Sequence, residues 1–183
     1  VNPSSLALPR LKERIGSVAV HTAVLPCSFA HSAEALRAAL ESVQPDIVLC
    51  VGLAGGRAEL CLERVAINVQ DARIRDNDGN QPIDVPVVEG GAAAYFATLP
   101  VKACVAEMRK AGLPAAVSNT AGTFVCNHIF YALMDMAARR PGPMRLPRQA
   151  QQACVSVSVS VSLCRPSPML LLCQACGVSI VRV

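Results

Sequence analysis

The stretch from residue 118 to residue 131 constrains the fold of this chain more than any other. The residues that lead into it, 114–118, form a short, apolar and partly β-branched run, which predicts a buried strand. Turn-forming residues come next: Asn119, Thr120 and Gly122. Apolar residues then recur at helical spacing: Ile129, Leu133 and Met136. The sequence therefore predicts a strand, a tight turn and a helix that begins near Cys126.

Cys126 would lie in the first turn of that helix, where backbone N–H groups lack acceptors within the helix and the helix dipole is positive. Both effects favour the thiolate, which is the nucleophilic form of cysteine. The same N–H groups could stabilise a developing oxyanion. A buried, inert cysteine on a core-facing helix explains the pattern equally well, so periodicity alone leaves both interpretations open.

A glycine-rich loop is the second feature that points to a site. The apolar run 46–51 is typical of a strand covered on both faces, and Gly52-Leu53-Ala54-Gly55-Gly56-Arg57 follows its end. Ligands bind at the carboxyl ends of strands in open α/β sheets, and glycines let the backbone approach a ligand closely. A plain turn is the favoured alternative, since the glycines lack the spacing of a dinucleotide-binding motif.

Strand and helix patterns alternate along the rest of the chain. Strands are predicted at 18–25 and 60–69, and one helix is predicted after Ser32 as its N-cap. A further helix runs from Val101 to a C-cap at Gly112. We therefore expect an α/β fold, as a three-layer α/β/α sandwich with a mostly parallel central sheet.

The C-terminal region differs from the rest in composition. No Asp or Glu follows Asp135, and valine and serine alternate from Val155 to Ser162. We expect residues 1–145 to form the α/β domain, which is incomplete. We expect residues 146–183 to form a low-complexity, poorly ordered tail.

Composition argues against several classes of function. The chain has two Tyr, four Phe and no Trp, and its basic residues do not cluster with aromatics, which argues against nucleic-acid binding despite a net charge of +4. Its longest charge-free apolar run, 169–181, is too short to predict a membrane span. Nine cysteines without a secretory signal favour a reducing, cytoplasmic setting. A lone C-x-x-C at Cys173 and Cys176 does not predict a metal site, and no motif predicts a cofactor.

Three blocks of the sequence carry a resemblance to a known family. They are residues 50–57 continuing through 63–68, residues 71–80, and residues 118–131. In this order and spacing they resemble pyroglutamyl peptidase I (pyrrolidone-carboxylate peptidase, cysteine peptidase family C15), from about Asn2 to Arg145. The resemblance implies a cysteine-type omega-peptidase that removes N-terminal pyroglutamate from peptides, uses no cofactor and forms a homo-oligomer, a tetramer in relatives.

The resemblance also assigns catalytic residues. Cys126 matches the nucleophile, and Glu63 matches the acidic member of the triad, which would accept an imidazole N–H and fix its tautomer. The family's histidine lies in a Gly-Phe-Ile-His context that does not occur after Arg145. The chain has three histidines, none of them in that context: His21, His31 and His128. His128 lies two helical positions from Cys126, where side chains point apart. The sequence therefore predicts a peptidase with impaired activity or, alternatively, an inactive remnant or truncated isoform that acts as a non-enzymatic protein.

Two further sets of residues follow from the same resemblance. Four match positions that line the pyroglutamate pocket: Leu53, Ile74, Phe124 and Val125. Five match the loops around the site and the oxyanion: Gly52, Gly55, Gly56, Arg57 and Arg73. An ordinary core position is an equal alternative for Ile74, and Glu63 taken alone would most often form a surface ion pair. An apolar pocket would accept a neutral lactam ring and exclude charged side chains.

Overall fold

The computed structural model describes residues 3–139, 153–159 and 176–182. The strands are β1 (Arg14–Ile15), β2 (Val18–Leu25), β3 (Ile47–Leu53), β4 (Leu60–Glu63), β5 (Val65–Ile67), β6 (Ala94–Phe96), β7 (Ala115–Ser118), β8 (Ala153–Val159) and β9 (Cys176–Arg182). The helices are α1 (Pro3–Ala7), the short 3-10 helix η1 (Leu8–Arg10), α2 (Ser32–Val43), α3 (Val101–Lys110) and α4 (Val125–Arg139). The predicted strand at 18–25 and the predicted helix that begins near Cys126 are confirmed.

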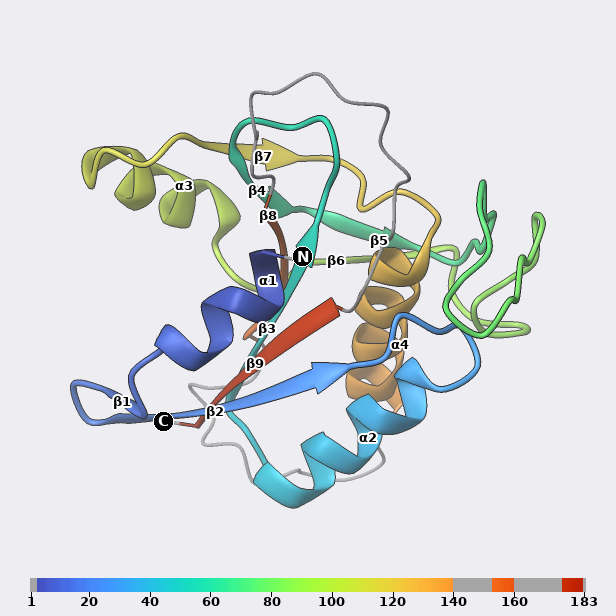
Figure 1. The fold of residues 1–183 in the computed structure, drawn as a ribbon, viewed down its shortest axis with the longest axis horizontal. Coiled ribbons are helices and arrows are strands. Elements are labelled where there is room, and N and C mark those ends of the chain that lie inside the picture. The colour runs from blue at the N-terminus through green and yellow to red at the C-terminus, as the bar shows by residue number, and fades with distance from the viewer. Residues whose placement is uncertain (1–2, 140–152, 160–175, 183) are drawn as a thin grey trace.

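A seven-stranded sheet runs through the centre of the molecule, in the order β1-β2-β9-β3-β8-β4-β7 (Figure 1). Strand β3 pairs with β8 in parallel, and so does β4 with β7. The other four neighbouring pairs are antiparallel. The α/β class is confirmed. The expectation that the sheet would be mostly parallel was wrong, because parallel and antiparallel pairs are mixed in it. The direction reverses at two places: β9 lies antiparallel between β2 and β3, and β4 pairs antiparallel with β8. No local pattern in the sequence reveals these pairings.

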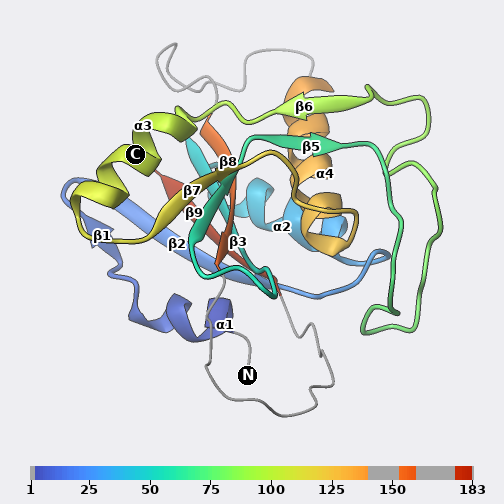
Figure 2. The same ribbon diagram turned by 90° about the horizontal axis from the view of Figure 1, so that it is seen from above.

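Helices cover both faces of this sheet, as expected for three layers. Figure 2 shows α2 and α4 on one side of the sheet and α1 on the other. Side chains of β3 alternate accordingly. Val48 and Cys50 pack in the core cluster of α2 and α4, whereas Leu49 packs in a second cluster with Val105 of α3.

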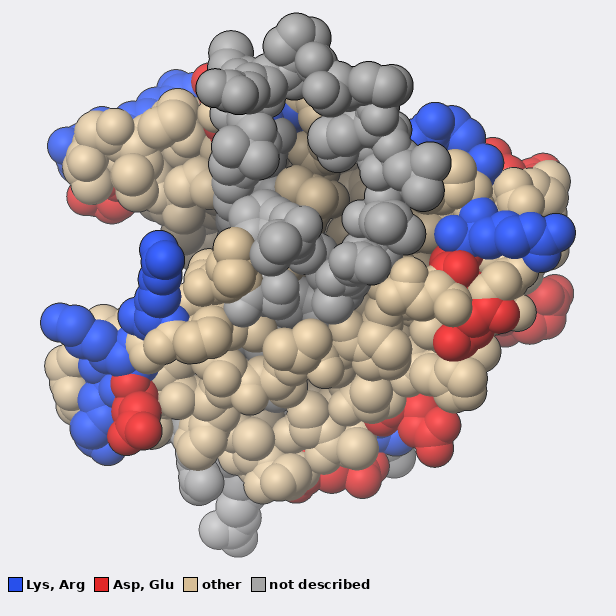
Figure 3. Space-filling view, in the orientation of Figure 1, with Lys and Arg blue, Asp and Glu red and all other residues tan. Residues whose placement is uncertain are grey.

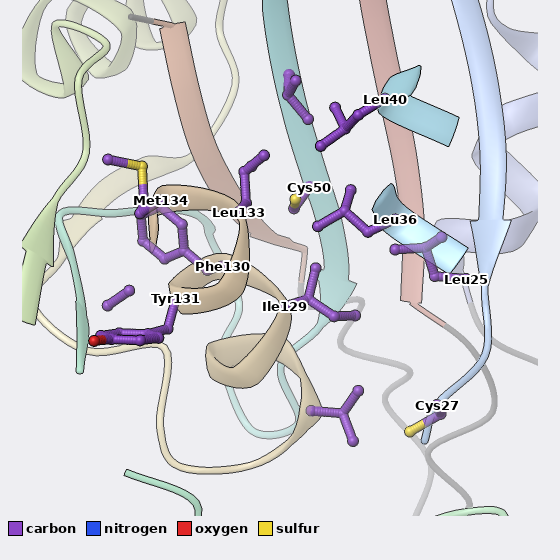
Figure 4. Close-up of a cluster of buried hydrophobic side chains, with 13 residues drawn as sticks. Leu25, Cys27, Leu36, Leu40, Cys50, Ile129, Phe130, Tyr131, Leu133 and Met134 are labelled. Atoms are coloured by element: carbon purple, nitrogen blue, oxygen red, sulfur yellow. The ribbon is translucent and has the colours of Figure 1, made fainter. Parts of the chain in front are cut away.

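The larger core cluster lies between α4, α2 and the sheet (Figure 4). Ile129, Phe130, Tyr131 and Leu133 are almost fully buried in it, and so is Leu36 of α2. Helix α4 therefore contributes nearly its whole length to the core, which fixes the position of its first turn. The smaller cluster on the opposite face is built around Leu62, Val105 and Ala115.

The run 60–69, expected as one strand, is divided in the structure. Strand β4 lies in the central sheet, whereas β5 pairs only with β6 in a separate two-stranded sheet. The division falls at Arg64, whose N–H donates to Ser118 O at 2.8 Å and whose carbonyl accepts from Ala97 N–H at 2.8 Å. The apolar alternation changes phase here, from Leu60 and Leu62 to Val65, Ile67 and Val69, with the charged pair Glu63-Arg64 between them. This interruption was the available signal for the change of sheet.

Two predicted helix boundaries can be compared with the structure. Gly112 was expected as the C-cap of α3, but Ala111 takes that position. Gly112 follows it with a φ of +78°, and its N–H donates to Arg109 O at 3.0 Å. Ser32 was expected as an N-cap, but it is already the first residue of α2, and His31 takes the cap position. The N–H of His31 donates to Ser28 Oγ at 3.1 Å, so Ser28 serves this turn instead.

The expected domain boundary after residue 145 lies outside the described residues and stays a prediction. Of residues 146–183, expected as a poorly ordered tail, the structure describes two stretches. Both are strands of the central sheet, β8 and β9.

Charged residues lie mainly at the margins of the face shown in Figure 3, where Lys and Arg are interspersed with Asp and Glu. Among the described residues, no helix is both long enough and apolar enough to cross a bilayer.

Candidate active site

Cys126 lies directly against the end of strand β3. A Cβ atom placed on Gly52 would be 2.8 Å from Cys126 Sγ and 4.0 Å from Cys126 Cβ. Real Cβ atoms essentially never lie 2.8 Å from another heavy atom, so residue 52 has to be glycine for the Cys126 thiol to occupy this place. Gly52 is therefore required by close approach, and the Cys126 thiol faces the start of the glycine-rich loop.

The turn before α4 is built by hydroxyl side chains. Ser118 Oγ donates to Thr120 O at 2.9 Å, and Thr120 Oγ1 accepts the N–H of Gly122 at 3.0 Å. Gly122 has a φ of +74°, a conformation that favours glycine. This turn reverses the chain between β7 and α4, so that Cys126 becomes the second residue of the helix. The half-buried thiol thus lies at the positive end of the helix dipole.

Glu63, at the end of β4, is completely buried. Its Oε1 accepts a hydrogen bond from Arg57 Nη1 at 3.1 Å. Its Oε2 has no hydrogen-bond partner among the described residues. The alternative of an ion pair at the surface was right about the pairing, since Arg57 is the partner, but wrong about the location, because the Glu63 carboxylate is buried.

The three histidines of the chain are all described, and none is hydrogen-bonded to Cys126. His21 is exposed on β2. His31 Nδ1 lies 2.8 Å from Asp78 Oδ2 in an exposed pair. His128 is only 6% exposed, and neither ring nitrogen has a hydrogen-bond partner among the described residues. None of the three histidines is therefore placed to act as a base toward the Cys126 thiol.

Burial of His128 has a consequence for acid stability. Desolvation lowers its pKa from 6.5 to about 4, so the unfolded chain takes up this proton at a higher pH than the folded one. The stabilising effect is complete above pH 6.5 and is lost as the pH falls towards 4. A shift of this size corresponds to about 3 kcal/mol of unfolding free energy, as an order of magnitude.

We therefore expect His128→Leu to flatten the pH dependence of stability between pH 7 and pH 4, measured by urea unfolding at several pH values. Leucine removes the titrating ring and keeps an apolar side chain beside Phe29. His21→Leu, a change at an exposed position, is the matched control and should retain the slope of the parent. An unchanged slope in His128→Leu would contradict this explanation.

An aromatic residue that sequence reasoning missed lies next to the predicted pocket residue Phe124. The rings of Phe29 and Phe124 meet edge to face, with centroids 5.3 Å apart. Phe29 also meets the His128 ring edge to face at 5.7 Å. Nothing in the local sequence around Phe29 signals this position, because it depends on a turn between β2 and α2 that is far from α4 in the chain.

Asp76 holds Phe29 in place and was also missed. Its carboxylate accepts the Phe29 N–H at 2.8 Å, the Asp78 N–H at 3.0 Å and the Asn80 N–H at 2.7 Å. Burial alone would raise the pKa of Asp76, but the hydrogen bonds from Phe29, Asn80 and Asp78 hold it below the ordinary value. The Asn/Asp/Gly composition of residues 76–80 predicted a loop, but did not predict this connection to the turn before α2.

Asn127, the neighbour of Cys126, is the third residue that was missed. It is fully buried, and its Oδ1 accepts the Ile67 N–H at 3.0 Å. Its Nδ2 donates to Ile67 O at 2.9 Å and to Val69 O at 3.0 Å. An amide on an otherwise apolar helix face was the available signal, since a buried polar side chain needs partners.

The other expected site residues fall into three settings. Val125 is fully buried in the core cluster, whereas Leu53, Ile74 and Phe124 are half-buried. Gly55 and Gly56 are exposed, and Gly56 has a φ of +83°, as a plain turn requires. Arg73 is exposed. The structure thus places Cys126 against Gly52, and connects Arg57 to Glu63 and to the turn before α4. In the register of the sheet, Glu63 is level with Cys50, two positions before Gly52. Within the described residues, no group of three or more His, Cys, Asp or Glu side chains could hold a metal ion.

Comparisons with known proteins show which family this chain is similar to. The family model for pyroglutamyl peptidase matches residues 1–158, somewhat beyond Arg145. The pyrrolidone-carboxylate peptidase of Erwinia tasmaniensis is 54% identical over 157 residues, which are 84% of this chain and 74% of that protein. The pyrrolidone-carboxylate peptidase of Streptomyces coelicolor is 60% identical over 139 residues, 75% of this chain and 64% of that protein.

A solved structure shares the fold as well. The crystal structure of Bacillus amyloliquefaciens pyroglutamyl peptidase I superposes with a TM-score of 0.81 at 43% identity. The match covers 93% of this chain and 81% of that one. Sequence, fold and the cysteine at the start of α4 lead to the same conclusion: this chain belongs to the pyroglutamyl peptidase family.

Proposed function

We propose that the chain is a cysteine-type omega-peptidase that removes pyroglutamate from the N-terminus of peptides, with Cys126 as its nucleophile. The observation that carries the proposal is the contact between Cys126 Sγ and Gly52 at the carboxyl end of β3. This end of a strand is where α/β sheets bind ligands, and the start of α4 favours the thiolate. The names of the relatives, pyrrolidone-carboxylate peptidases, support the substrate class.

In the proposed reaction, the Cys126 thiolate attacks the carbonyl carbon that joins pyroglutamate to the next residue. The C–N bond breaks, the amine leaves with a proton, and a thioester remains on Cys126. Water then hydrolyses the thioester to give free pyroglutamate and restore the thiol. Backbone N–H groups in the first turn of α4 and in the loop from Gly52 to Arg57 are the candidates to stabilise the oxyanion.

Phe124, Ile74 and Leu53 are proposed to contact the neutral lactam ring, because all three are apolar and half-buried. Phe29 supports Phe124 from the side. Val125 is proposed to contribute through its backbone, since its side chain is buried in the core. Arg73 has no role that its exposed position explains.

This site lacks an identified catalytic base. Glu63 is proposed to be the acidic member of a triad, which orients an imidazole. No histidine of the chain lies where it could connect Glu63 to Cys126 through hydrogen bonds. We therefore propose slow turnover, and the histidine positions favour one alternative, an inactive family member that retains the scaffold and acts without catalysis.

Further properties are proposed from the family resemblance. The partners would be peptides with N-terminal pyroglutamate, and the chain would assemble as a homo-oligomer, as its relatives do in tetramers. A cytoplasmic location would keep the Cys126 thiol reduced.

The proposal predicts selectivity for the lactam. We expect the chain to release aminomethylcoumarin from pyroglutamyl-aminomethylcoumarin faster than from the prolyl or glutaminyl compound, by about tenfold or more in kcat/KM. Proline lacks the lactam carbonyl and glutamine lacks the ring, so each control removes one feature. Equal rates with all three compounds would contradict the proposal, and no release from any of them would favour the inactive alternative.

A further inference from the structure

We propose that Arg57 is a positioning residue that fixes the Glu63 carboxylate and the turn before Cys126 relative to each other. This inference rests on the proposed function, since it concerns the same site. Arg57 would not contact substrate in this role. It would act by keeping the acid residue and the nucleophile in one geometry.

The guanidinium of Arg57 bridges two segments of the chain. Its Nη1 donates to Glu63 Oε1 at 3.1 Å, and its Nη2 donates to Thr120 O at 3.3 Å. Glu63 is the last residue of β4, whereas Thr120 belongs to the turn that leads into α4. One side chain thus connects the acidic residue to the turn that positions Cys126.

The two segments already meet in the sheet, but only by backbone contacts. Strands β4 and β7 are parallel neighbours, and Glu63 pairs with Ser118 in their register. After this pair both strands end and the segments diverge. The two hydrogen bonds of Arg57 extend the connection past the strand ends, to the residues that would take part in chemistry.

Burial gives this bridge its importance. The Glu63 side chain is 0% exposed, whereas that of Arg57 is 34% exposed. A buried carboxylate is strongly disfavoured unless a cation or several donors accompany it. Arg57 is the only partner found for Glu63 among the described residues, and Oε2 remains without one. Arg57 therefore both neutralises Glu63 and leaves Oε2 available.

The planar fork of arginine suits this bridge better than lysine would. Arginine presents several N–H donors at fixed angles and can reach two acceptors at once, whereas the lysine ammonium is a compact point charge. Arg57→Lys would keep the positive charge beside Glu63 and weaken the link to Thr120. Arg57→Met would remove both. The two variants therefore separate charge from geometry.

The test compares Arg57→Met, Arg57→Lys and the parent chain, with Arg37→Met as the matched control at an exposed position on α2. Three quantities are measured: kcat and KM for pyroglutamyl-aminomethylcoumarin, the rate of Cys126 carboxamidomethylation against pH by peptide mass spectrometry, and the thermal unfolding midpoint. For Arg57→Met we expect kcat to fall by about tenfold to a hundredfold, with KM changed much less. Arg57→Lys should lie between Arg57→Met and the parent.

Alkylation provides the readout that does not depend on turnover. Removal of Arg57 takes a positive charge away from the site and removes the hydrogen bond to Thr120 O in the turn before α4, and both changes disfavour the Cys126 thiolate. We expect Cys126 in Arg57→Met to react about threefold or more slowly with iodoacetamide at pH 7. If the parent chain shows no hydrolysis, slower alkylation of Cys126 in Arg57→Met than in the parent would support the positioning role and overturn the proposed function.

Two results would overturn the positioning role. One is a kcat and an alkylation profile in Arg57→Met that match those of Arg37→Met. The other is a loss of kcat in Arg57→Met that disappears when rates are expressed per folded molecule and that leaves the alkylation profile unchanged.

Discussion

Alanine at position 126 is expected to reduce hydrolysis of pyroglutamyl-aminomethylcoumarin to the rate measured without protein. In the proposed mechanism the thioester forms on the Cys126 thiol, so its removal ends covalent catalysis instead of slowing it. Loss of a nucleophile commonly costs about 10³-fold or more in kcat. The measurement is coumarin fluorescence over time at equal concentrations of folded protein, checked by circular dichroism.

Cys104→Ala is the matched control for this experiment. Cys104 is a half-buried cysteine of α3, on the face of the sheet opposite to α4. This variant should retain the rate of the parent chain. Activity that survived in Cys126→Ala, or that was lost equally in Cys104→Ala, would show that the nucleophile has been misassigned.

The second large effect concerns the parent chain itself. Its kcat/KM for the same substrate is expected to lie about 10²–10⁴-fold below that of the Erwinia tasmaniensis relative, assayed side by side. Without an imidazole between Glu63 and Cys126, the site lacks the base that would deprotonate the thiol and the acid that would protonate the leaving amine, as far as the described residues go. The helix N-terminus supplies part of the thiolate stabilisation, but it cannot deliver a proton.

Two features of the data should accompany this low rate. The loss should appear mainly in kcat, because the base acts on the chemical step and not on binding. The rate should also rise with pH as the thiolate forms, without an ionisation limb assignable to any of the three histidines. A kcat/KM comparable to that of the relative would show that another group in the chain serves as the base.

Sequence reasoning succeeded where the determinants are local. The period of two in residues 18–25, the helical spacing after Cys126 and the glycine at position 112 each depend on a few neighbouring residues. Side chains within one turn of a helix or along one strand are enough to set these elements. The position of Cys126 in the first turn of α4 followed from the same signals.

It failed where partners lie far apart in the chain. The 60–69 run was expected as one strand, yet β5 lies outside the central sheet, where Asn127 exchanges hydrogen bonds with the backbone of Ile67. Asp76 takes hydrogen bonds from Phe29, 47 positions away. The direction of β9 is set by the two strands on either side of it. No periodicity carries such pairings, since each is a choice among many distant partners.

The side chain of Asn127 has a consequence for how the site comes into being. It connects the residue beside the nucleophile to backbone groups 60 and 58 positions earlier in the chain. Contacts of such separation form late in folding, because a long loop has to close before they contribute. We therefore expect the first turn of α4, and with it Cys126, to be held in place later in folding than the local turns of the glycine-rich loop. In that case the proposed nucleophile would acquire its surroundings when α4 docks, and the proposed site would form together with the completed core.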